Sequence, residues 1–118
     1  MVKIMIMNED VLRKKTITDI KKDREQKVDR IIYFNSLSDF RKVFTIERIR
    51  LLSAVKENKP NSLYALAKIL NKDFKNVQSD AKLLESFGLL SLERFDVGLR
   101  QSLKPRTQLH KLEMSMAI

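Results

Sequence analysis

Residues 62–89 have the sequence SLYALAKILNKDFKNVQSDAKLLESFGL, which reads as two short helices joined by a tight turn. Ser62 is suited to the N-cap of the first helix, and Asp73 to the N-cap of the second. Asn71 can take the left-handed conformation that ends a helix, and Gly88 can end the second one. This spacing predicts a helix-turn-helix, in which the second helix crosses the first steeply and protrudes from it.

The second of these helices, expected over residues 73–87, has two distinct faces. At 100° per residue, one face gathers the apolar side chains Phe74, Val77, Ala81 and Leu84. The opposite face carries no acid and consists of Lys72, Lys75, Asn76, Ser79, Lys82 and Ser86. Lys, Asn and Ser can donate hydrogen bonds to base edges and phosphates. We therefore predict DNA contacts from Lys72, Lys75, Asn76, Ser79 and Lys82, although any surface helix also has a solvated polar face.

A further helix is expected before this pair, over residues 45–58. Thr45 is a plausible N-cap, and the apolar residues recur at three-residue steps as Ile46, Ile49, Leu52 and Val55. These four side chains are predicted to form the buried stripe of an amphipathic helix.

The segment after Gly88 favours DNA binding over the solvated-face interpretation. A strand is expected over residues 89–94, and a loop over residues 96–105. Four cations surround this segment, against the single acid Asp96, and they are Arg94, Arg100, Lys104 and Arg106. Three helices followed by a basic hairpin is the order of a winged helix-turn-helix, whose wing places such cations on phosphates or in the minor groove.

The two ends of the chain predict additional strands. Residues 1–7 and 30–34 read as strands, separated by a charged helix over residues 9–27, and a short helix follows over residues 37–43. A separation of about twenty residues suits a parallel crossover better than a hairpin. A last strand is expected over residues 110–118.

These elements together predict an α+β fold. We expect an N-terminal strand-helix-strand extension over residues 1–43 and a winged helix-turn-helix over residues 44–118. The methionines concentrate in the two terminal strands, where they can fill a core or form a dimer surface. The extension is therefore the expected dimerisation segment.

Four motifs carry a resemblance to a known family. They are Arg-x-x-Leu-Leu at residues 48–52, Ser-x-x-x-Leu-Ala-x-x-Leu at 62–70, Lys-Asn-Val-x-x-Asp at 75–80 and Leu-Glu-x-x-Gly-Leu at 84–89. The sequence that contains these motifs resembles a family of small predicted transcriptional regulators, which are MarR-like winged-helix proteins of archaea, bacteria and their mobile elements. The most specific part is Lys75-Asn76-Val77 with Asp80 and Gly88-Leu89.

The resemblance implies a homodimer that binds double-stranded DNA through the third helix and wing, as a repressor. Several relatives are encoded beside small toxin proteins, which implies an antitoxin that represses its own operon. The chain departs from the family at Asn71, where Gly is common, and at Lys72, where Arg is common. The wing differs in length and sequence, which leaves the minor-groove contacts open.

Composition excludes several classes of function. The chain of 118 residues has no Cys, one His and two Gly, so it lacks a thiolate, a His-rich metal site and a phosphate-binding loop. We expect no catalytic residues, no metal and no cofactor. Residues 1–7 are too short for a signal peptide or a membrane span, so a cytoplasmic location is expected. The net charge of +9 favours an anionic partner, but it is spread almost evenly along the chain.

Two other functions remain open at this point. The chain could be a protein-interaction module, such as an antitoxin whose apolar terminal strands bind a cognate toxin while its basic surface is incidental. It could also bind RNA or serve in a larger assembly. Competition between duplex DNA and structured RNA, and co-purification with a neighbouring gene product, separate these alternatives.

Overall fold

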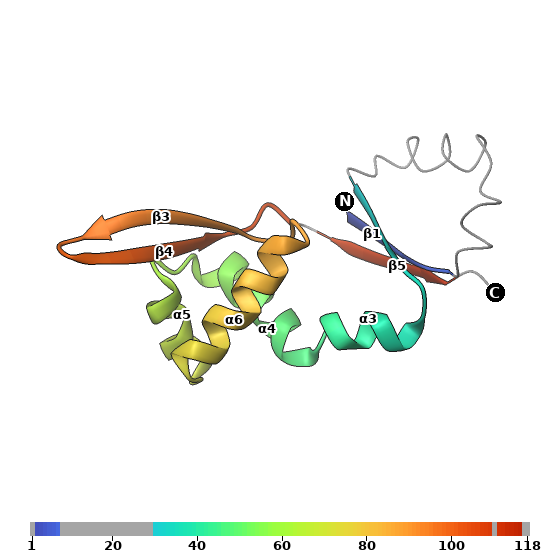
Figure 1. The fold of residues 1–118 in the computed structure, drawn as a ribbon, viewed down its shortest axis with the longest axis horizontal. Coiled ribbons are helices and arrows are strands. Elements are labelled where there is room, and N and C mark those ends of the chain that lie inside the picture. Colours follow the sequence, from blue (N-terminus) through green and yellow to red (C-terminus); the bar gives the residue numbers. More distant parts are fainter. Residues whose placement is uncertain (1, 8–29, 110, 117–118) are drawn as a thin grey trace. The chain divides into compact units, whose positions relative to one another are not determined.

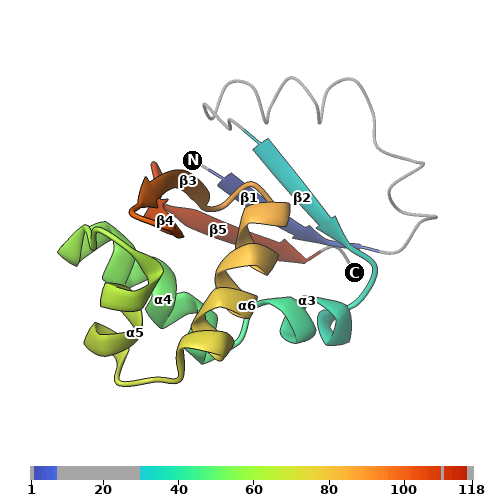
Figure 2. The ribbon, with the colours of Figure 1, turned by 60° about the vertical axis from the view of Figure 1, so that its left-hand side comes forward.

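A parallel sheet is formed by the two ends of the chain. Its central strand β1 (Val2–Ile6) lies between β2 (Arg30–Phe34) and β5 (Leu112–Met116), as Figure 2 shows. Both pairings with β1 are parallel. The expected crossover between the first two strands is therefore confirmed, because parallel neighbours cannot be joined by a tight turn.

One face of this sheet is apolar, and it is buried unevenly. Ile4 lies opposite Ile32 on one side and Met114 on the other, so these side chains share a face. Ile4 and Ile32 are buried, whereas Met114 is 55% exposed. The short helix α3 (Leu37–Val43) follows β2 at the residues expected for it.

The computed structural model describes residues 2–7, 30–109 and 111–116, and the chain forms two units. Residues 1–43 and 109–118 make one unit, and residues 44–108 make the other. The sequence interpretation placed the last strand in the second domain, whereas in the structure it belongs to the first unit because it pairs along β1. The predicted helix over residues 9–27 lies outside the described residues, and so does His110, the single histidine of the sequence.

The second unit begins with three helices, shown in Figure 1. They are α4 (Ile46–Asn58), α5 (Leu63–Leu70) and α6 (Phe74–Ser86). Their ends follow the expected caps. Ser62 Oγ accepts a hydrogen bond from the backbone N–H of Ala65 at 3.0 Å, and Asn71 is left-handed with φ 52°.

The buried face of α4 differs from the predicted one. Ile46 and Ile49 are 70% and 46% exposed, while Leu51, Leu52, Ala54 and Val55 are buried. A step of three residues advances only about 300° around a helix, so a three-residue repeat drifts by about 60° per step. Over the nine residues from Ile46 to Val55 the drift is about 180°, which carries the start of the stripe to the solvent face.

A long antiparallel hairpin completes the second unit. Its strands are β3 (Ser91–Val97) and β4 (Arg100–Arg106), and they pair from Ser91 opposite Arg106 to Val97 opposite Arg100. The predicted loop over residues 96–105 is therefore wrong, since only Gly98 and Leu99 separate the strands. Gly98 has φ 63°, a conformation that favours glycine in such two-residue turns.

Helices and small sheets together make an α+β protein, as the sequence predicted. Within the part of the chain that the structure describes, the helices are too short or too polar to cross a lipid bilayer.

Candidate nucleic-acid interface

Helix α6 is held in the second unit by its apolar face. Val77, Ala81 and Leu84 are almost completely buried, and α6 contacts both α4 and α5. An ion pair adds to this packing, because Arg48 Nε donates to Asp80 Oδ1 at 3.0 Å across α4 and α6. The orientation of α6 is thus fixed by its inner face, which leaves the outer face free for a ligand.

The outer face of α6 brings together most of the residues predicted on it. Lys75, Asn76, Ser79 and Lys82 are all exposed, and none of them is an acid. Lys72 precedes the helix and differs from them, since its Nζ lies 3.4 Å from Glu47 Oε2. The positive charge of Lys72 is therefore partly balanced by its own protein.

A groove of about 680 Å³ lies between α6 and the hairpin. Lys82 of α6 lines it on one side, and Arg94 and Arg100 of the hairpin line it on the other. Three of the predicted contact residues, from two elements distant in sequence, thus converge on one groove. The full lining is Leu63, Tyr64, Phe74, Gln78, Lys82, Arg94, Val97 and residues 100–103.

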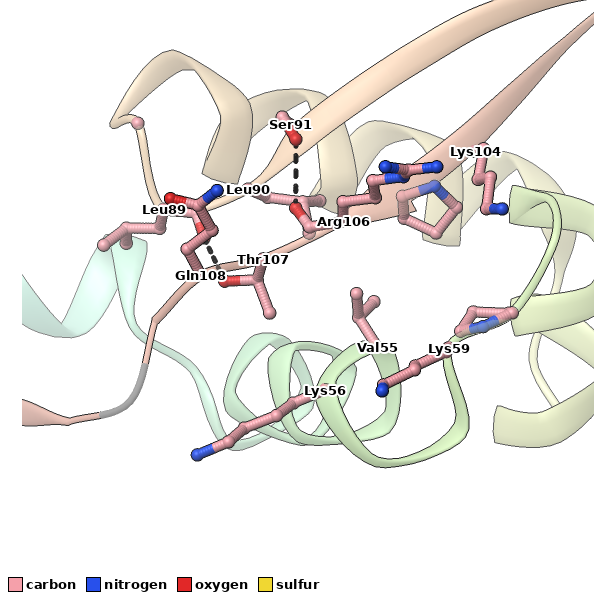
Figure 3. A pocket seen from close by; sticks show the side chains of 13 residues that line it. Val55, Lys56, Lys59, Leu89, Leu90, Ser91, Lys104, Arg106, Thr107 and Gln108 are labelled. Atoms are coloured by element: carbon pink, nitrogen blue, oxygen red, sulfur yellow. Dashed lines mark hydrogen bonds between the residues drawn. The ribbon is translucent and has the colours of Figure 1, made fainter.

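The structure separates the other two predicted hairpin cations from this groove. Lys104 and Arg106 line a different cavity, at the base of the hairpin, together with Lys56 and Lys59 (Figure 3). Arg106 Nη2 also lies 3.2 Å from Glu93 Oε2. The four predicted hairpin cations therefore form two separate pairs, one at the groove beside α6 and one at the base of the hairpin.

Sequence reasoning did not select Gln78 or Tyr64 as site residues. Gln78 is half-buried and lines the groove beside Lys82. The Tyr64 ring lies 5.9 Å from the Phe74 ring, and Lys68 Nζ lies 4.9 Å from the Tyr64 ring centre. Gln78 falls between the two faces of α6, so only the position of the hairpin reveals that it borders a groove.

Comparison with solved structures finds a protein with a similar fold. A solved structure described as a "possible transcriptional regulator from Methanosarcina mazei Go1" is similar, with a TM-score of 0.50 and 18% sequence identity. The similarity covers 59% of this chain and 62% of that one, so somewhat less than two thirds of the neighbour is spanned.

A family model identifies the group of proteins more directly. The model of the HVO_A0114 family matches residues 43–112, and the chain belongs to that family. No curated protein matches the chain. The match covers the whole of α4, α5, α6 and the hairpin, so it includes the unit that holds the groove.

Proposed function

We propose that residues 44–108 form a MarR-like winged helix-turn-helix and that the protein is a transcriptional regulator binding specific double-stranded DNA. In this proposal α6 is the recognition helix and the β3–β4 hairpin is the wing. One observation carries it. The exposed face of α6 holds cations and amides without an acid, and it adjoins a groove that is also lined by hairpin arginines.

The dimensions and chemistry of this surface suit duplex DNA. The major groove of B-DNA is about 12 Å wide and admits one α-helix. Ser79 is the small residue at the centre of the exposed face, so the helix can approach the base edges closely. The backbone carries one negative charge per phosphate, which Lys82, Arg94 and Arg100 can neutralise from the groove.

We assign different roles to the amides and the cations. Asn76 and Gln78 can make bidentate hydrogen bonds to adenine, and Lys75 can donate to guanine. Lys82, Arg94 and Arg100 would contact phosphates and add affinity for any sequence. Lys72 would contribute less, because Glu47 lies beside it.

Footprinting of the DNA upstream of the protein's own gene tests the proposal. We expect a protected site, with affinity that falls steeply as salt is raised. Asn76→Ala should relax the preference for that site, by about 1–3 kcal/mol of discrimination. Arg100→Ala should weaken binding to all sequences alike and lower the slope of log affinity against log salt by about 1.

A matched control removes the same charge elsewhere. Arg41 is exposed on α3, in the other unit, so Arg41→Ala should leave the footprint unchanged. Absence of any protected site at low salt would overturn the proposal. Stronger binding to structured RNA than to duplex DNA would favour the RNA-binding alternative instead.

We propose in addition that the regulator is a homodimeric repressor located in the cytoplasm, without an enzymatic activity or a cofactor. A two-fold dimer would read a palindromic operator with half-sites one helical turn apart. The footprint tests this directly, because a dimer protects two symmetric half-sites and a monomer protects one. A cognate toxin remains a prediction, and co-expression with the neighbouring gene product tests it.

A further inference from the structure

The tip of the β3–β4 hairpin, here defined as residues 97–100, carries exposed apolar side chains. Leu99 is 108% exposed and Val97 is 57% exposed. Phe95 lies two residues before Val97 in β3, so both side chains share one face of the hairpin, and Phe95 is 36% exposed. Figure 1 shows the hairpin extending past α5 to this tip. The apolar tip is therefore open to a partner molecule.

The turn at the tip explains Gly98 but not Leu99. Gly98 has φ 63°, whereas Leu99 is not left-handed, which is the pattern of a type II′ turn with glycine first. A Cβ atom at Gly98 would meet nothing within 4 Å, so glycine serves the backbone conformation and not a close contact. Polar residues dominate turns that face water. Since Leu99 is fully exposed, folding gives no reason for an apolar side chain at this position.

Cations lie beside the apolar tip. Arg100 lies opposite Val97 in the last rung of the hairpin, and Arg94 lies further along β3. Asp96 pairs with Gln101, and its side chain points to the opposite face from Val97. Val97 and Arg100 also line the groove beside α6. The tip thus continues the proposed DNA interface with an apolar group that is flanked by positive charge.

The minor groove of duplex DNA offers both kinds of contact that this tip can make. Its two backbones are anionic, and its stacked base pairs separate to admit an apolar wedge such as leucine. An anionic membrane surface would also attract cations and apolar side chains. The groove that adjoins the tip holds Gln78 and Gln101, whose amides match base edges, so the surface as a whole favours DNA.

The length of the hairpin suits a contact with two neighbouring grooves of DNA. Each strand has 7 residues, which at about 3.4 Å per residue give a hairpin about 24 Å long. Major and minor groove centres alternate about every 17 Å along B-DNA, because one helical turn spans about 34 Å. With α6 in the major groove, the hairpin can therefore place its tip in the adjacent minor groove.

We propose that Leu99 is a wedge residue that inserts between two base pairs in the minor groove, unstacks them and bends the duplex. This role rests on the proposed DNA binding and adds a second source of sequence preference to it. Arg94 and Arg100 hold the flanking phosphates while the leucine enters the stack. Pyrimidine–purine steps such as TA unstack most easily, so the protein prefers such a step beneath the tip without contacting its base edges.

Unstacking and bending can be measured separately from binding. The full-length protein is added to a duplex that spans the footprinted site. Fluorescence anisotropy reports binding, and energy transfer between dyes at the two DNA ends reports bending. 2-Aminopurine, placed at successive positions, becomes brighter where it is unstacked. With the wild type we expect a bend of about 20–90° and a rise in 2-aminopurine fluorescence that is confined to one step.

Three variants isolate the contribution of the leucine. Leu99→Ser should abolish the bend and the fluorescence rise but weaken binding by less than about 10-fold, because the lost apolar contact is offset by base pairs that stay stacked. Leu99→Met keeps an apolar wedge and should retain both signals. Ile46→Ser is the matched control, since it removes a 70% exposed apolar side chain from α4, and should change neither signal. Thermal unfolding of Leu99→Ser should match the wild type.

The outcomes distinguish failure of the wedge from failure of DNA binding. A bend that Leu99→Ser retains would overturn the wedge, and so would wild-type binding without bending or unstacking. Either result would leave the proposed DNA binding intact, whereas no binding of the wild type to the duplex would overturn both. If Leu99→Ser keeps the DNA signals but loses binding to phosphatidylserine vesicles, the tip contacts a membrane surface and the wedge is overturned.

Discussion

At the scale of single residues, the position of a charge matters more than the number of charges. Arg48 and Asp80 are 19% and 21% exposed, and their ion pair joins the first helix of the unit to α6. Lys72 and Glu47 are 27% and 66% exposed, and their pair lies nearer to solvent. Both pairs join elements distant in sequence, so they form a matched comparison of half-buried and exposed ion pairs.

We predict that Asp80→Ala lowers the free energy of unfolding by about 1–2 kcal/mol. This value lies between the effect of breaking an exposed pair, about 0–1 kcal/mol, and a buried pair, about 3–5 kcal/mol. Glu47→Ala should cost less than about 1 kcal/mol by the same argument. Urea denaturation of both variants measures the difference, and equal losses would show that burial of the Arg48–Asp80 pair adds nothing.

Gln78 gives a second prediction at this scale. Its amide borders the groove between α6 and the hairpin. In the proposed DNA complex, this amide would reach a base edge from the flank of the helix. Gln78→Ala should reduce discrimination at one base pair by about 1–3 kcal/mol while leaving the salt dependence of binding unchanged. Binding to a set of operator variants measures this. A uniform loss across all sequences would show that Gln78 positions the helix and does not read a base.

At the scale of elements, capping residues explain where the helices begin. Ser62 Oγ accepts from the backbone N–H of Ala65, whereas Asp73 occupies the N-cap of α6 without a side-chain hydrogen bond. Ser62→Ala should therefore destabilise the protein by about 1 kcal/mol. Asp73→Ala should cost distinctly less, because no capping bond is lost. Thermal unfolding of the two variants measures this, and a larger loss for Asp73→Ala would contradict it.

The helices could be predicted from the sequence because their signals are local. Caps at Ser62 and Asn71 and the 100° face of α6 all depend on residues within a few positions of one another. The residues at which the hairpin strands begin and end could not be predicted in this way. Nearly every side chain of β3 is exposed, so it lacks the alternation of apolar and polar residues that marks a strand.

The same limit applies to the site residues. The exposed face of α6 follows from helical geometry, and the structure brings Lys75, Asn76, Ser79 and Lys82 together as predicted. The separation of Lys104 and Arg106 from Arg94 and Arg100 does not follow from spacing. It depends on the register of the hairpin, which places Arg100 at the tip and Arg106 at the base, and puts Arg94 and Lys104 on adjacent rungs whose side chains point to opposite faces.

At the scale of the whole molecule, the last strand of the chain pairs with the first. β5 pairs along β1, so the first unit needs both ends of the chain, while the second unit is continuous over residues 44–108. No local signal reports that pairing, because its partners are separated by more than a hundred residues. The net charge is also spread almost evenly along the chain, so by itself it does not indicate where a binding site lies.

The continuity of the second unit leads to a last prediction. A fragment of residues 44–108 should fold alone, because its helices and hairpin bury their apolar residues against one another. A chain of this length is only marginally stable, so we expect cooperative unfolding with a free energy of a few kcal/mol.

A fragment of residues 1–43 lacks β5, leaves β1 with one neighbour and should not fold. Amide spectra of both fragments measure this. A dispersed spectrum for residues 1–43 would show that this fragment folds without β5. A poorly dispersed spectrum for residues 44–108 would show that the second unit does not fold without the rest of the chain. Either result would contradict the prediction.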